Sequence, residues 1–148
     1  MLSIVEDDIT EIKVQYIAHQ CNATHNRNFG LSSKISKKFP FANLYCGKFA
    51  ESNRKPGSII VRENVIAMIA QINQGQPKSG QETNTSREKL FKKCLEEIAA
   101  IKDIHEVAFP FGIGCGYAGG DWDTYFDMIV DFSEKYPNIN VILVRFSG

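Results

Sequence analysis

Apolar and polar positions alternate in blocks along the chain, and the blocks predict strands and helices in turn. Short runs rich in branched and aromatic residues predict strands over 2–5, 14–18, 58–61, 65–72, 104–109 and 139–146. The run over 65–72 is apolar at nearly every position, which is typical of a central strand buried on both faces.

Three segments repeat apolar side chains at helical spacing. Leu31, Ile35 and Phe39 recur at i, i+4 and i+8 before Pro40, which predicts a short helix. A long amphipathic helix is expected after the capping-box spacing of 85–88, with an apolar face formed by Leu90, Phe91, Cys94, Leu95, Ile98 and Ile101. A last helix is expected after Asp121, an N-cap candidate, with an apolar face formed by Trp122, Tyr125, Phe126, Ile129 and Val130.

Strands that alternate with helices favour an α/β fold. We expect a three-layer α/β/α sandwich with a mixed sheet of about six strands, in a single domain over 1–148. A polar cluster from His19 to Asn28, too polar for the core, follows one strand, and a glycine-rich loop follows another. Because ligands bind where loops meet at strand ends, these two segments are expected to share one cleft.

Composition narrows the classes of function. The 148 residues carry 17 basic and 17 acidic side chains, so that no net field favours nucleic acid or a membrane surface. Neither a membrane-spanning run nor a signal peptide is seen, and the four cysteines form no CxxC pair. We therefore expect reduced thiols in a cytoplasmic protein.

The glycine loop has five glycines within nine residues, between a predicted strand and a predicted helix. Glycine allows backbone N–H groups to approach a ligand closely, and a helix N-terminus favours anions, so the loop is a candidate phosphate cradle. The alternative is a tight turn. Gly114, Gly116 and Gly119 also match a dinucleotide-binding fingerprint, but that motif follows the first strand of a Rossmann domain and this one lies near the end of the chain.

With both loops considered, the sequence resembles the macrodomain family of ADP-ribose-binding modules. The resemblance rests on four segments, which are Asp8-Ile9, the strand segment 17–22, Gly30-Leu31 and the 113–122 segment. It implies that Asp8 binds the adenine amino group, that Asn22 faces the distal ribose, and that Gly30 cradles that ribose and a phosphate. The implied diphosphate loop includes Gly114, Cys115, Gly116, Tyr117, Ala118 and Gly119. Ile9, Cys21 and Leu31 are expected to line the site, and Phe146 to stack on the adenine, although an aromatic residue there also suits the core.

The finer resemblance is to the small branch with the yeast-type ADP-ribose-1''-phosphate phosphatase and the terminal ADP-ribose protein glycohydrolase. His19-Gln20-Cys21 and 113–116 carry it. Glycohydrolase members have a lysine at the end of the buried strand and an aspartate after the glycine loop, where this chain has 70–73 without lysine and Ala118. The lysine-adduct mechanism is therefore not expected. The phosphatase-type histidine is retained as His19.

Three functional hypotheses remain open. In the first, His19 and Asn22 position water, or His19 protonates a leaving oxygen, and the protein hydrolyses ADP-ribose-1''-phosphate or an ADP-ribosyl bond. In the second, the domain binds ADP-ribose, or an ADP-ribosylated protein or nucleic acid, without catalysis. In the third, Cys115 is a nucleophile activated by the helix N-terminus, against the alternative that it is a small packed residue.

A metal site is not expected, and neither is a cofactor. His19, Cys21 and His25 have a spacing that suggests zinc, but a fourth ligand is not apparent.

Overall fold

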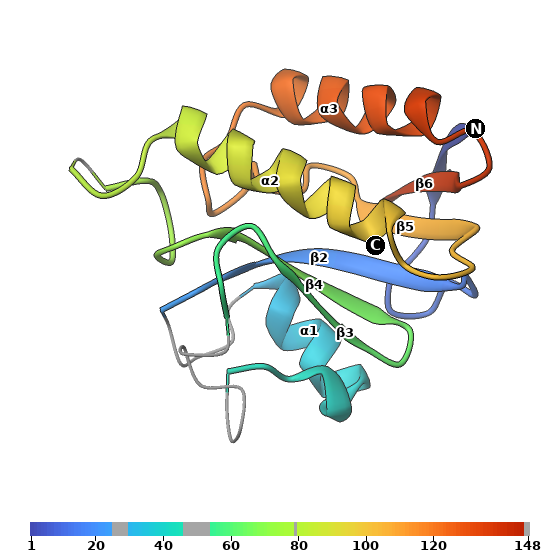
Figure 1. Ribbon diagram of the computed structural model, residues 1–148. Helices are drawn as coiled ribbons and strands as arrows, with labels where there is room; N and C mark the ends of the chain where they lie inside the picture. The colour runs from blue at the N-terminus through green and yellow to red at the C-terminus, as the bar shows by residue number, and fades with distance from the viewer. Residues whose placement is uncertain (25–29, 46–53, 79, 147–148) are drawn as a thin grey trace.

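A computed structural model describes residues 1–24, 30–45, 54–78 and 80–146 (Figure 1). Its sheet contains six strands in the order β1-β6-β5-β2-β4-β3. They are β1 (Leu2–Glu6), β2 (Tyr16–Asn22), β3 (Ile59–Arg62), β4 (Val65–Gln71), β5 (Glu106–Pro110) and β6 (Asn140–Arg145). The described pairs are parallel except β3 with β4, which are antiparallel and joined by a tight turn, so the sheet is mixed.

Helices cover both faces of this sheet. Helices α2 (Asn84–Ala99) and α3 (Trp122–Lys135) lie on one face, and α1 (Leu31–Lys38) lies on the other (Figure 1). A short 3-10 helix, η1 (Pro40–Ala42), follows α1. The expected three-layer sandwich is confirmed. Among the described residues, none of the helices is long and apolar enough to cross a membrane.

Two layers of core follow from the alternation of side chains along the strands. Ala18 of β2 packs in the main cluster with Phe91 of α2 and Ile129 of α3. Its neighbour Ile17 packs in a second cluster with Ile35 of α1. Successive β2 residues therefore face opposite helical layers, and this sets how the end of β2 presents its side chains.

The polar residues at the end of β2 are part of the strand, which corrects the expectation that the strand stops at Ala18. His19 is 3% exposed and Asn22 is 6% exposed, so this part of the polar cluster lies in the core. The strand continues because β4 provides a parallel partner, with Cys21 paired to Ile69 and Asn22 to Gln71 across a register shift. Polar partners from other elements make this burial possible.

Helix α2 begins earlier than its sequence signal indicated. Thr83 is the N-cap: its Oγ1 accepts the N–H of Ser86 at 2.9 Å, and the Ser86 hydroxyl accepts the N–H of Thr83 at 2.9 Å. The expected capping box over 85–88 is therefore wrong by two residues. Serine replaces the usual Glu or Gln at the third helical position, so the standard motif did not detect this cap.

Candidate functional site

A cavity of about 340 Å³ lies at the carboxyl ends of β2, β4 and β5. It is lined by 19–22, 30–32, Tyr45, Gln71, Gln74, Gly75 and 110–118. The end of β2 and the glycine loop therefore share one cavity, as the sequence predicted. Parallel strands bring these segments together because their carboxyl ends meet at the same edge of the sheet.

His19 lies on the α1 side of the cavity, buried with two polar neighbours. Its Nδ1 is 3.2 Å from Ser32 Oγ of α1 and 3.5 Å from Cys21 Sγ. Burial lowers the pKa of His19 to about 4. The imidazole is therefore neutral at neutral pH. In this form it can accept a proton or orient water, but it is not the protonated general acid that could donate a proton to a leaving group.

Tyr45 and Arg54 hold the last residue of β2 in place. The Tyr45 hydroxyl accepts the backbone N–H of Asn22 at 3.0 Å, and Arg54 Nη1 donates to the Asn22 carbonyl at 3.2 Å. The Arg54 guanidinium also lies 4.9 Å from the centroid of the Tyr45 ring. Sequence reasoning missed both residues because they lie in a segment without periodicity. A buried arginine beside an aromatic ring is visible only in the fold.

The two cysteines of the cavity are protonated thiols. Burial raises the pKa of Cys21 to about 12, and burial together with the nearby carboxylates of Asp121 and Glu88 raises the pKa of Cys115 to about 12. Cys115 Sγ donates to the carbonyl of Ile113 at 3.3 Å. The thiolate that the helix N-terminus was expected to stabilise does not form at neutral pH, which counts against a Cys115 nucleophile.

Gly114 shows why the loop needs glycine. Its φ is +78°, and a Cβ there would lie 2.7 Å from Cε2 of Tyr125 and 2.9 Å from Oε1 of Gln20. The loop therefore lies directly on β2 and α3, with its backbone toward the cavity. Gly116 is different, since it is exposed and a Cβ there would meet nothing within 4 Å.

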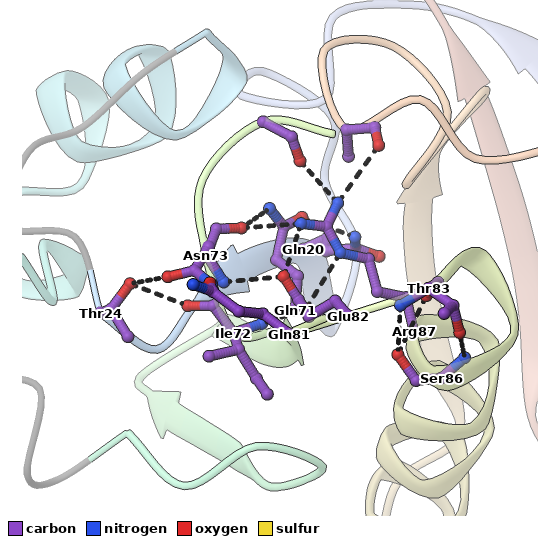
Figure 2. Close-up of polar contacts among 12 residues, drawn as sticks. Gln20, Thr24, Gln71, Ile72, Asn73, Gln81, Glu82, Thr83, Ser86 and Arg87 are labelled. Atoms are coloured by element: carbon purple, nitrogen blue, oxygen red, sulfur yellow. Dashed lines mark hydrogen bonds and ion pairs between the residues drawn. The ribbon is translucent and has the colours of Figure 1, made fainter. Parts of the chain in front are cut away.

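The loop after β4 forms the remaining wall. Composition alone did not show whether the loop over 73–84 faces a ligand. Gln74 and Gly75 line the cavity, beside Gln71 at the end of β4. Gln20 Nε2 donates to Gln71 Oε1 at 2.7 Å, and Gln71 Nε2 donates to the Asn73 carbonyl at 2.8 Å (Figure 2). Sequence reasoning missed Gln71 and Gln74. The signal that could have found them is the presence of glutamine where the buried apolar strand ends.

Four of the predicted binding residues lie outside this lining. Gly119 does not line the cavity, and neither do Asp8, Ile9 and Phe146. Asp8 Oδ1 accepts from the hydroxyl of Thr10 at 2.7 Å and from its N–H at 2.9 Å, and these bonds, with the nearby charge of Lys34, lower the pKa of Asp8. Lys34 Nζ also lies 4.2 Å from the centroid of the exposed Phe146 ring. Lys34 is thus near both residues expected at the adenine, Asp8 and Phe146, while Ile9 is buried in the α1 core.

The remaining predicted lining residues are in place. The structure brings together His19, Cys21, Asn22, Gly30, Leu31, Gly114, Cys115, Gly116, Tyr117 and Ala118. His25, which completed the suggested zinc spacing, lies outside the described residues, as do Asn28 and Phe29. The described residues contain no group of three His, Cys, Asp or Glu side chains arranged to hold a metal ion.

Comparison of sequences alone identifies no relative. No protein-family model matches the chain, and no curated protein is significantly similar to it in sequence.

Comparison of structures identifies the fold. The macrodomain of Mycobacterium tuberculosis DarG is 13% identical, with a TM-score of 0.76 over 100% of this chain and 99% of that one. A Bacteroides thetaiotaomicron protein is 22% identical, with a TM-score of 0.76 over 99% of this chain and 100% of that one. Thermosipho africanus DarTG, solved in complex with ADP-ribose, is 17% identical, with a TM-score of 0.74 over 97% of this chain and 41% of that one. Together with the sheet order and the cavity at its carboxyl edge, these matches show that the chain has the fold of a macrodomain.

Proposed function

We propose that the cavity binds ADP-ribose. The observation that carries the proposal is the meeting of the glycine loop with the end of β2 in one cavity, within a fold that includes a protein solved with ADP-ribose bound. In this proposal the diphosphate lies against the N–H groups of the loop over 113–118, since backbone donors beside a helix N-terminus favour anions. The distal ribose lies toward Asn22 and Gly30, and the adenine toward Asp8, Ile9 and Phe146.

Binding without catalysis is the function that the electrostatics favour most. Among the described residues that line the cavity, none is Asp, Glu, Lys or Arg. Cys21 and Cys115 are protonated at neutral pH, and His19 is neutral. A site that breaks a glycosidic or phosphate bond requires a group that gives or takes a proton readily near the working pH. The described lining offers only a weak base, His19.

Hydrolysis is the second candidate, and the position of His19 favours it. His19 and Asn22 both belong to β2, and both line the cavity. A neutral His19 would accept a proton from water while Asn22 orients the distal ribose. The substrate would be ADP-ribose-1''-phosphate or a protein or nucleic acid with an ADP-ribosyl group.

The binding test is a thermal-shift panel with ADP-ribose, ADP-ribose-1''-phosphate, NAD and AMP, followed by calorimetry. A ligand at one hundred times its Kd stabilises the folded state by about 2.7 kcal/mol. We expect ADP-ribose to raise the melting temperature more than AMP does. A rise with AMP and none with ADP-ribose would contradict the proposal.

The catalytic test follows product formation from ADP-ribose-1''-phosphate and from an ADP-ribosylated protein. It compares the wild-type protein with His19→Ala. The binding proposal predicts ligand affinity with no product after long incubation. Product formed by the wild type and lost in His19→Ala would support hydrolysis, whereas equal turnover by both would exclude a role for His19.

A further inference from the structure

Arg87 lies in the first turn of α2, is 2% exposed, and uses all of its guanidinium N–H groups (Figure 2). Nε donates to Glu82 Oε1 at 3.1 Å, and Nη2 donates to Glu82 Oε2 at 2.9 Å. Nη2 also donates to the Asn73 carbonyl at 2.9 Å. Nη1 donates to the Gly75 carbonyl at 2.6 Å and to the Ala118 carbonyl at 3.2 Å.

Glu82 orients this guanidinium from the loop after β4. Its two carboxylate oxygens also accept the N–H groups of Ile72 at 2.6 Å and Asn73 at 3.1 Å. Burial alone would raise the pKa of Glu82, but the hydrogen bonds from Arg87, Ile72 and Asn73 outweigh it and hold the pKa below its usual range. The pair is therefore ionised at neutral pH, and its geometry is bidentate and fixed.

The contacts of Arg87 Nη1 join two walls of the cavity. Gly75 belongs to the loop after β4 and Ala118 to the glycine loop, and both line the cavity. A Cβ added on Gly75 would lie 3.4 Å from Cε1 of Tyr117, so the two loops lie close together at this point. Arg87 Nη1 thus bridges the loop after β4 and the glycine loop.

A second path leads from Arg87 to the wall formed by β2. The Asn73 carbonyl, which accepts from Arg87, also accepts from Gln71, and Gln71 accepts from Gln20. Rotating either carboxamide would place oxygen against oxygen, so the orientation of both glutamines follows from the Asn73 carbonyl. Gln20 and Gln71 both line the cavity.

We propose that Arg87, oriented by Glu82, is a positioning residue of the ADP-ribose site. It does not line the cavity but fixes the spacing of the glycine loop and the loop after β4, and the orientation of Gln71 and Gln20 between them. This inference rests on the proposed function for its ligand.

We expect the packing of α2 to tolerate loss of the ion pair. A buried pair costs desolvation on both sides, and apolar side chains of similar volume often replace such pairs without loss of stability. An apolar side chain would not bond to three loop carbonyls. Stability and ligand affinity are therefore expected to respond differently to substitution.

The test compares Arg87→Met with the double variant Glu82→Gln/Arg87→Met. The single variant leaves the Glu82 carboxylate buried without its guanidinium, and we expect its melting temperature to fall. The double variant removes that charge, and the carboxamide introduced by Glu82→Gln retains one oxygen acceptor in place of the two that bind the N–H groups of Ile72 and Asn73, so part of the melting temperature returns. Lys89→Met, at an exposed position of the same helix, is the control.

Two readouts separate positioning from stability. Calorimetry should show ADP-ribose binding at least about tenfold weaker in both Arg87 variants, including the double variant with partly restored stability. Hydrogen exchange in the ligand-free proteins should show faster exchange over 113–119 in both variants than in the wild type and in Lys89→Met.

The inference is wrong if the double variant binds ADP-ribose as the wild type does, or if its 113–119 amides exchange at the wild-type rate. Failure of the wild type to bind ADP-ribose would refute the proposed function instead. In that case the exchange rates of the ligand-free proteins still decide whether Arg87 positions the glycine loop.

Discussion

At the scale of single residues, His19 shows how burial changes a side chain that the sequence marked for proton transfer. An ordinary histidine titrates near neutrality, which made His19 a candidate acid or base. In the folded protein its pKa is about 4 because burial penalises the charged form. The residue is therefore a neutral hydrogen-bonding partner of Ser32 and Cys21 at neutral pH.

This burial makes the stability of the protein depend on pH. Because the folded-state pKa lies below the unfolded value of 6.5, the unfolded chain takes up a proton at His19 first as the pH falls. The contribution of neutral His19 is complete above pH 6.5 and is lost as the pH falls toward 4. Between pH 7 and pH 4.5 the loss is about 2.5 kcal/mol in the free energy of unfolding.

Urea unfolding of the wild type and His19→Gln at pH 7, 6, 5 and 4.5 measures this loss. Glutamine stays neutral throughout, so we expect the wild type to lose stability relative to the variant as the pH falls. The lowered pKa of Glu82 acts mainly below 4.5 and does not interfere. Parallel curves for the two proteins would show that His19 is not responsible.

The glycine loop provides a second test, in which a single Cβ atom is added at either of two glycines. Gly114→Ala would combine a positive φ with a Cβ 2.7 Å from the buried ring of Tyr125, which itself packs on Phe91 with centroids 4.8 Å apart. Neither ring has room to move, so we expect a loss of about 2 kcal/mol or more. Gly116→Ala should change the free energy of unfolding by less than about 1 kcal/mol. Chemical unfolding of both variants provides the comparison, and equal losses would contradict the strain argument.

At the scale of elements, the start of α2 is the clearest difference between pattern and structure. The capping-box spacing of 85–88 predicted Thr85 as the N-cap, because Glu88 follows three residues later. The structure uses Thr83 with Ser86. Glu82 and Arg87 also bind to each other across this turn.

Substitution at the two threonines distinguishes these starts. Thr83→Ala removes the acceptor for the Ser86 N–H, and we expect a loss of about 1 kcal/mol in stability. Thr85→Ala, at an exposed position inside the helix, should be neutral or slightly stabilising. Thermal unfolding of the pair measures the difference. A larger loss of stability from Thr85→Ala than from Thr83→Ala would instead indicate that Thr85 is the N-cap, as the capping-box spacing predicted.

The N-terminus of α3 shows a related effect. Asp121 is at the N-cap position, as the sequence predicted, but its carboxylate accepts the Thr124 hydroxyl at 2.7 Å and makes no side-chain cap to a backbone N–H. The position of a cap residue is therefore encoded locally, whereas its hydrogen bonds depend on the rotamers of its neighbours.

At the scale of the whole molecule, the order of the strands in the sheet determines which loops meet at the cavity. Strands β5 and β2 are far apart in the sequence and adjacent in the sheet, so the loops that follow them meet. Helices α1 and α3 lie on opposite faces of the sheet (Figure 1). The cavity is lined by 30–32 at the start of α1 and by 110–118, the loop that leads to α3.

The sequence by itself determined the number and type of the main helices and strands and the glycine-rich loop between β5 and α3. Periodicity and glycine spacing are local properties that neighbouring residues encode. Only the tertiary structure decided the protonation of His19 and Cys115, the burial of Asn22 and the buried contacts of Arg87. Those properties depend on groups far away in the sequence and on the low dielectric of a shared interior, neither of which a linear pattern contains.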